Sequence, residues 1–229
     1  FHRSKPQIVE LPASAFEHNL RRVVVDLKID DEGRINGEGT MELEGHQAWR
    51  YLRWKEDADA TTEAWQEHLA GKFEGYEVED VQVEERIRDQ YLRVGWSLRQ
   101  REEDVLGDEV IVQPSLPVGP ITQPFSLPPH LRNTPVQLSY GKRDDLVMTL
   151  SWPAGWEIDL LPETMSHEGP AGKVDCRVEA DESGGRLTFR RRFDLVERDF
   201  RDRDSYGVLR DLYEQAAKAD AQNLVLVRD

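Results

Sequence analysis

The stretch from residue 22 to residue 43, RVVVDLKIDDEGRINGEGTMEL, carries the clearest structural pattern in the chain. Apolar residues occupy every second position from Val23 to Ile29, and charged residues fill most of the positions between them. Such alternation is typical of a β-strand with one buried face. Residues 30–33 supply tight-turn chemistry, and the inward phase resumes at Ile35. The stretch therefore predicts an antiparallel hairpin with one face on a core.

Two glycines, Gly37 and Gly39, fall on the predicted buried face of the second strand. Glycine inside a strand often marks a place where another backbone or a large ring approaches closely. We therefore expect close packing against this part of the hairpin.

The rest of the chain repeats the short-strand pattern, interrupted by two helical stripes. Trp65, Leu69 and Phe73 recur at helical spacing and predict a helix near residues 60–73, and a second stripe from Tyr206 to Ala216 predicts one near 205–219. The expected fold class is α+β and mostly antiparallel β, sandwich-like, with a helical insertion in the first lobe and a C-terminal helix.

Seven prolines between positions 114 and 135 predict an extended connector. We expect a first lobe at residues 1–104, the connector at 105–135 and a second lobe at 136–229. The two lobes can also form one continuous domain. The chain starts with Phe1 rather than Met, so we expect further sequence ahead of it.

The net charge of −15 excludes some classes of partner. Between residues 56 and 85 there are eleven acidic residues against a single Lys or Arg, Lys72. A surface of this sign repels phosphate backbones, so nucleic acid is not an expected partner. No apolar run approaches the roughly 20 residues of a membrane span, so membrane insertion is not expected either.

The lone cysteine, Cys176, is the obvious candidate nucleophile, and it excludes an internal disulfide. It shares its strand phase with Val174 and Val178, which predicts a buried, structural thiol. The histidines show no metal-ligand spacing, and solvation explains the clustered acids. We therefore expect no catalytic, cofactor or metal site, and a hydrolase that uses Cys176 remains an alternative.

Three residues are possible contacts with a partner. Arg191 falls in the inward phase between Phe189 and Phe193. Either a bulge shifts the strand register there, or the guanidinium forms a structural ion pair with a carboxylate at the edge of the core; a ligand or partner contact is the alternative. His167 lies in a segment that resembles a turn, and Trp54 lies outside the apolar stripes.

The tryptophans leave a second function open. Trp49, Trp65, Trp96 and Trp152 fit apolar stripes and are expected in the core. If some of the six tryptophans are exposed instead, the chain can be a stand-alone sandwich that binds carbohydrate or peptide.

Several short motifs together resemble the C-terminal domain that follows the catalytic core of bacterial transglutaminase-like proteins. They are a Val-Glu-Leu-Pro segment at residues 9–12, the first hairpin at 25–37, a central segment at 132–140, a turn between two strands at 150–162 and the closing helix at 206–226. Ser151 and Trp152 depart slightly from the family pattern.

The resemblance implies an accessory role. In that family the Cys-His-Asp triad belongs to the central, papain-like domain, and no position here matches it. The implied partner is a transglutaminase-like catalytic domain of the same polypeptide, N-terminal to Phe1, which this segment would pack against or orient. Family members are commonly exported, so the resemblance also implies a periplasmic or extracellular location.

Overall fold

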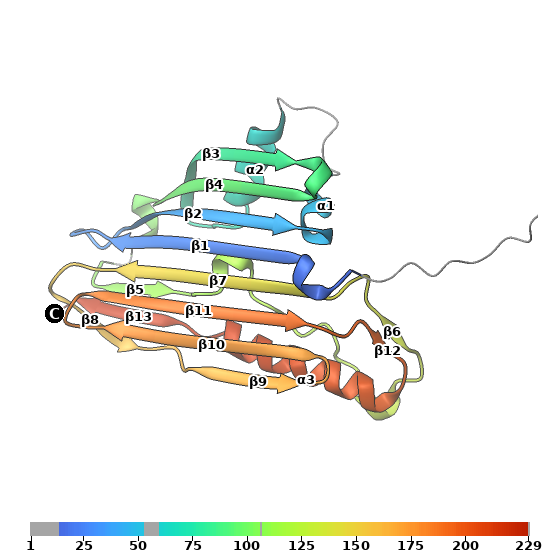
Figure 1. Cartoon of the computed structure of the whole chain (residues 1–229). Coiled ribbons are helices and arrows are strands. Elements are labelled where there is room, and N and C mark those ends of the chain that lie inside the picture. The colour runs from blue at the N-terminus through green and yellow to red at the C-terminus, as the bar shows by residue number, and fades with distance from the viewer. Residues whose placement is uncertain (1–13, 53–59, 106, 229) are drawn as a thin grey trace, which may run out of the picture.

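The computed structural model describes residues 14–52, 60–105 and 107–228. An eight-stranded sheet dominates it, with the strand order β3-β4-β2-β1-β7-β11-β10-β9 (Figure 1). The strands are β1 (Leu20–Ile29), β2 (Ile35–Glu44), β3 (Tyr76–Arg86), β4 (Tyr91–Gln100), β7 (Lys142–Ser151), β9 (Met165–Gly169), β10 (Gly172–Asp181) and β11 (Arg186–Leu195).

The middle of this sheet joins the two halves of the chain. Strands β1 and β7 pair in parallel, with Val23 opposite Leu146, while the other neighbours in the large sheet are antiparallel. Strands from both sides of the proline-rich connector therefore belong to one continuous sheet.

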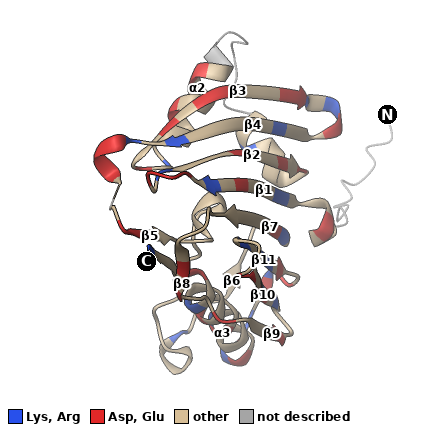
Figure 2. Ribbon diagram, turned by 90° about the vertical axis from the view of Figure 1, so that its left-hand side faces the viewer, with Lys and Arg blue, Asp and Glu red and all other residues tan. Residues whose placement is uncertain are grey.

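A second layer covers only one face of the large sheet, as Figure 2 shows from the side. It contains α1 (His46–Leu52), α2 (Ala60–Ala70), α3 (Arg203–Asp220) and a three-stranded sheet of β5 (Glu109–Val112), β13 (Leu224–Arg228) and β8 (Trp156–Leu160). The short strands β6 (Val136–Gln137) and β12 (Asp199–Phe200) form a separate pair. The predicted α+β class with mostly antiparallel strands is confirmed, although helices make up much of the second layer.

The first hairpin forms as its alternation predicts. Strands β1 and β2 pair from Arg21–Leu43 to Ile29–Ile35, and Gly33 takes a positive φ of 86° in the turn. A Cβ added to Gly39 would lie 2.4 Å from the ring of Trp96, so the predicted close approach of a large ring is confirmed there.

The helices differ in detail from their predicted bounds. Helix α2 ends at Ala70, before Gly71, although Phe73 is still buried beyond its end. Helix α3 begins earlier than predicted because Asp202 is its N-cap: the Asp202 carboxylate accepts a hydrogen bond from the Ser205 amide at 2.8 Å. No helix among the described residues is long and apolar enough to cross a membrane.

The proline-rich connector runs along α3 in the opposite direction to the helix. The Gln123 side chain donates a hydrogen bond to the carbonyl of Arg210 at 2.7 Å, and the Tyr206 hydroxyl donates one to the carbonyl of Leu127 at 2.8 Å. These bonds satisfy polar groups along an extended segment that proline keeps out of sheets. The connector also contains the short 3-10 turns η4 (Leu116–Val118) and η5 (Pro129–Leu131).

Candidate functional site

The candidate nucleophile, Cys176, lies in the core. Its side chain is completely buried on β10, as predicted, and burial raises the pKa of the thiol to about 12. The residues opposite it on the neighbouring strands are Arg191 and Met165. A thiol attacks as its thiolate, so burial and the raised pKa both disfavour nucleophilic attack by Cys176. Among the described residues, no group of three His, Cys, Asp or Glu side chains could hold a metal ion.

The ion pair predicted for Arg191 is present, and it is completely buried. The Arg191 guanidinium donates to both carboxylate oxygens of Asp220, at 3.0 and 2.8 Å. Asp220 is the last residue of α3, and its carboxylate also accepts bonds from the Ser115 hydroxyl at 2.9 Å and the Ile121 amide at 2.8 Å. The cluster therefore ties β11, α3 and the connector together.

His167 does not belong to this cluster. The turn predicted around His167 is wrong: the residue lies within β9, because the segment pairs with β10, where His167 is opposite Val174. The His167 Nε2 atom is 3.3 Å from a carboxylate oxygen of Asp211 on α3. Trp54 lies outside the described residues.

The core prediction holds for three tryptophans and fails for one. Trp65, Trp96 and Trp152 are buried, whereas Trp49 is 44% exposed. Helix α1 turns Ala48 and Leu52 toward the core, which leaves Trp49 on a different side of the helix. The other described tryptophan, Trp156, is also buried, so the described tryptophans provide no cluster of exposed rings for stacking on a sugar.

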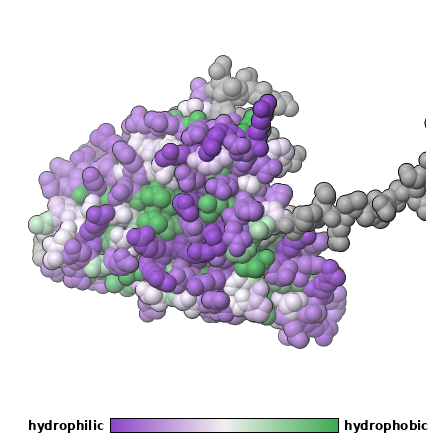
Figure 3. All heavy atoms as spheres, viewed as in Figure 1, coloured by the Kyte–Doolittle hydropathy of each residue, from purple (hydrophilic) through white to green (hydrophobic). Residues whose placement is uncertain are grey.

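The uncovered face of the large sheet is the site that best fits a partner, and we call it the outer face. At its centre, Val24 on β1 is 42% exposed and lies opposite the half-buried Val147 on β7. Figure 3 shows apolar surface near the middle of this face, enclosed by hydrophilic side chains. Apolar surface ringed by polar groups is typical of a protein interface.

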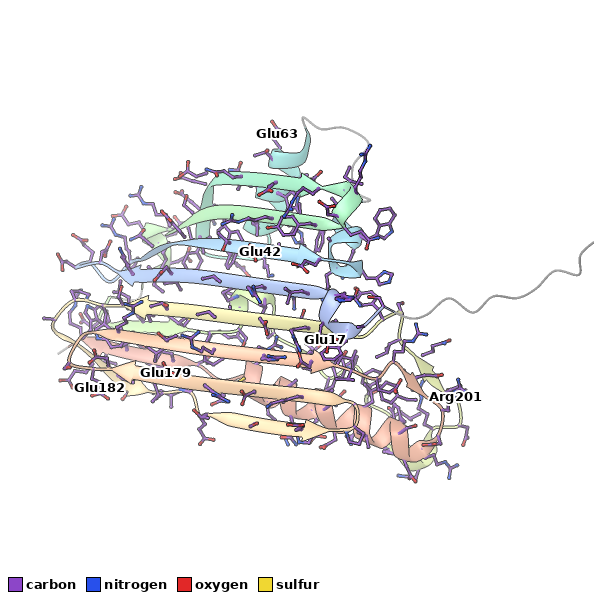
Figure 4. All side chains as sticks on the ribbon, in the orientation of Figure 1. Glu17, Glu42, Glu63, Glu179, Glu182 and Arg201 are labelled. Carbon is purple, nitrogen blue, oxygen red and sulfur yellow. The ribbon has the colours of Figure 1, made fainter. Side chains whose placement is uncertain are left out.

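Arginines surround this apolar centre. A shallow groove of about 250 Å³ crosses β1, β7, β11 and β10, and the outward side chains along it are Arg22, Asp145, Val147, Asp175, Arg177, Arg190 and Arg192. Carboxylates lie farther out: Figure 4 shows Glu42 on β2, and Glu179 and Glu182 at the far end of β10.

Most of these arginines have carboxylate partners. Arg177 lies 3.1 Å from Asp175, and Arg192 lies 3.0 Å from Asp194. Among the described residues, Arg190 has no carboxylate within 4 Å, which leaves it free to meet an acidic group of a partner. Burial raises the pKa of Asp145. Its carboxylate makes only a long ion pair with the Arg22 guanidinium, at 3.8 Å. A partner that brings acidic groups to this face would gain charge complementarity.

The described chain starts at one end of the outer face. The first described segment is Ser14 and Ala15, followed by the turn η1 (Phe16–His18). The guanidinium of Arg143, which points outward from β7, lies 5.1 Å from the centre of the Phe16 ring. A domain attached ahead of Ser14 would therefore be tethered beside this face.

Comparison with known proteins gives one family match and one solved structure to report. The sequence model of a domain of unknown function, DUF3858, matches residues 108–226, which run from just before β5 to within β13. No curated protein matches. The crystal structure of a putative protease from Parabacteroides distasonis ATCC 8503 matches with a TM-score of 0.42 and 18% identity, over 52% of this chain and 23% of that chain.

Proposed function

We propose that this chain, which belongs to the family of the domain of unknown function DUF3858, is a non-catalytic accessory domain of a longer, transglutaminase-like protein. In this proposal the outer face docks onto the catalytic core that precedes the domain. The catalytic thiol belongs to that core, and Cys176 takes no part in the chemistry.

The observation that carries the proposal is the uncovered face of the large sheet. A sheet with one solvated face normally presents polar residues there. Here an exposed valine lies at the centre of the face, with arginines around it. Since η1 packs at one end of the same face, the described chain begins beside the surface that we assign to docking. The buried thiol supports the second half of the proposal, because a catalytic cysteine needs access to substrate.

The transglutaminase-like identity of the core, and an exported location, rest on the sequence resemblance alone. The sequence encoded ahead of Phe1 tests the identity of the core, because we expect it to encode a thiol-protease-like domain. Fractionation of cells that produce the full-length protein tests the second.

The docking surface can be tested with two matched variants. Val24→Asp places a charge at the centre of the outer face, and Leu160→Asp places one on β8 in the opposite layer, at a site that is 49% exposed. We expect the separately produced core and accessory domain to associate in isothermal titration calorimetry. Val24→Asp should weaken this association at least about tenfold, because burying a carboxylate at an apolar interface centre, opposite the acidic groups of the partner, costs more than about 1.4 kcal/mol.

Leu160→Asp should leave the association unchanged. The docking proposal is wrong if the two proteins do not associate at about 0.1 mM, or if both variants weaken binding equally. The non-catalytic role is tested separately: Cys176→Ala in the full-length protein should retain its activity, and loss of activity in a folded variant would contradict that role.

A further inference from the structure

A cavity of about 470 Å³ lies between the two layers, at a seam in the covering layer. On one side of the seam are α2 and the loop that leads to β3, and on the other are β5 and the turn η4. The inner face of the large sheet forms the floor, through Val25, Leu27, Leu98 and Met148. Phe73, Ile111, Val112, Leu116 and Pro117 complete the apolar walls.

Two leucines of the floor flank a glycine. In the sheet register, Gly37 on β2 lies directly between Leu27 on β1 and Leu98 on β4. A Cβ built on Gly37 would lie 2.8 Å from a methyl carbon of Leu27, so the Leu27 side chain lies over the glycine and keeps the floor apolar. The volume is within the range of about 300–1,000 Å³ that is typical of small-molecule sites.

The charged side chains of the cavity are both acidic. Glu74 and Asp104 are exposed members of its lining, and their segments lie close together: a Cβ built on Gly75, next to Glu74, would lie 3.5 Å from the Asp104 carboxylate. Among the described residues, neither carboxylate has a basic side chain within 4 Å. A carboxylate pair without a cation repels anions and attracts a positive group.

Tyr76 adds a third polar group at the same place. Burial, together with the nearby charge of Asp104, raises the pKa of Tyr76 to about 12. Within the described part of the chain this hydroxyl has no hydrogen-bond partner. It is therefore available to accept a hydrogen bond from a ligand ammonium or to donate one to a ligand oxygen.

We propose that this cavity binds an organic cation with an apolar body, a small amphiphilic amine. The ammonium group lies between Glu74 and Asp104, within reach of Tyr76, and the hydrocarbon portion lies on the leucine and valine floor. This binding activity goes beyond the accessory role and is independent of it, because the cavity opens between the layers and the docking surface is the outer face.

The test uses the whole chain and a set of probes that differ only in charge. Hexylamine, hexanol and hexanoate are titrated in isothermal titration calorimetry at pH 7 and low salt. Hexylamine should bind with a dissociation constant between about 10 μM and 1 mM, as expected for so small a ligand. Hexanol should bind at least about tenfold more weakly, hexanoate more weakly still, and added salt should weaken the binding of hexylamine. N-acetyl-lysine N-methylamide tests whether a peptide side chain can supply the same cation.

Two pairs of variants locate the site. Glu74→Gln with Asp104→Asn removes both charges, and the control pair Glu102→Gln with Glu103→Gln removes two exposed charges from η3 (Glu102–Asp104) that do not line the cavity. Ile111→Trp obstructs the cavity from a position that is 47% exposed, and Leu160→Trp makes the same change elsewhere in the three-stranded sheet. We expect at least about a tenfold loss of hexylamine affinity in each cavity variant and less than a twofold change in each control.

Three results would overturn the proposal. The first is that hexylamine does not bind at about 10 mM, a concentration about tenfold above the weakest dissociation constant that we expect. The others are equal affinities for hexylamine and hexanoate, or equal losses of affinity in the cavity and control variants. Each result leaves the accessory role untouched, since that role is tested on the opposite face.

Discussion

At the scale of single residues, Cys176 gives a direct chemical test of burial. Because burial raises the pKa of the thiol to about 12, its thiolate fraction at pH 8 falls on the order of a thousandfold below that of an ordinary cysteine. We expect iodoacetamide to label the native chain at least that much more slowly than the chain in urea, as followed by mass spectrometry. Rapid labelling of the folded chain would restore Cys176 as a candidate nucleophile.

Asp144 should control the acid stability of the chain. Burial alone would raise the pKa of this carboxyl, but Arg21, Lys142 and Arg191 more than offset that effect and hold it well below its ordinary value near 3.8. A lowered folded pKa stabilises the protein above the unfolded pKa, and this stabilisation is lost as the pH falls below about 4.

Asp144→Asn should therefore cost about 3 kcal/mol at pH 7 in urea unfolding, and it should make the loss of stability below pH 4 shallower. The neighbouring Asp145 has a raised pKa, so its ionised form gains nothing from folding. Asp145→Asn is the control and should change stability at pH 7 by no more than about 0.5 kcal/mol. Equal losses in the two variants would contradict this assignment.

The sequence predicts which residues are buried better than it predicts their partners. The phase of β11 alone places Arg191 inside, because it lies between Phe189 and Phe193. It does not identify Asp220 as the counter-charge, since 45 acidic residues are available and the pairing depends on how α3 packs. The cavity also cannot be predicted from the sequence, because its lining comes from many separate segments whose packing the sequence pattern does not show.

At the scale of elements, the close contact between β2 and β4 can be tested with two glycines. A Cβ on Gly39 would lie 2.4 Å from the Trp96 ring, whereas one on Gly95 would have its nearest neighbour at 4.0 Å. Gly39→Ala should destabilise the chain by about 1–3 kcal/mol through overpacking. Gly95→Ala should be neutral or slightly stabilising, because alanine lowers the entropy of the unfolded chain. The free energies of unfolding of both variants can be measured in urea. Equal values would show that the Trp96 ring can move aside.

Elements with a strong period are predicted well, and those defined by pairing are not. The first hairpin and α3 follow directly from alternation and from the apolar stripe. Strand β9 has no apolar alternation, since it reads Met165 to Gly169 as MSHEG, and only its pairing with β10 makes it a strand. The sequence does not single out Asp202 as the cap, because Asp199, Asp204 and Ser205 lie close to it and only backbone geometry separates them.

At the scale of the whole molecule, the predicted lobes share the large sheet and one hydrophobic core. We expect the chain to unfold in a single transition, with a calorimetric enthalpy equal to the van't Hoff enthalpy. Two separate transitions in scanning calorimetry would instead show that residues 105–135 divide independent domains. The parallel contact of β1 with β7 was not predictable, because strand alternation contains no information about which distant strand lies alongside.

The parallel contact between β1 and β7 can form only after β7 has been synthesised, well after β1. Arg21 and its partner Asp144 are 123 residues apart in sequence, so at about 5–20 residues per second a ribosome needs roughly 6–25 s to deliver the second strand after the first. During that interval the nascent hairpin presents an open edge along β1, with nothing of its own to pair with it. Molecular chaperones that shield such edges should therefore matter most for this chain before its second half has emerged.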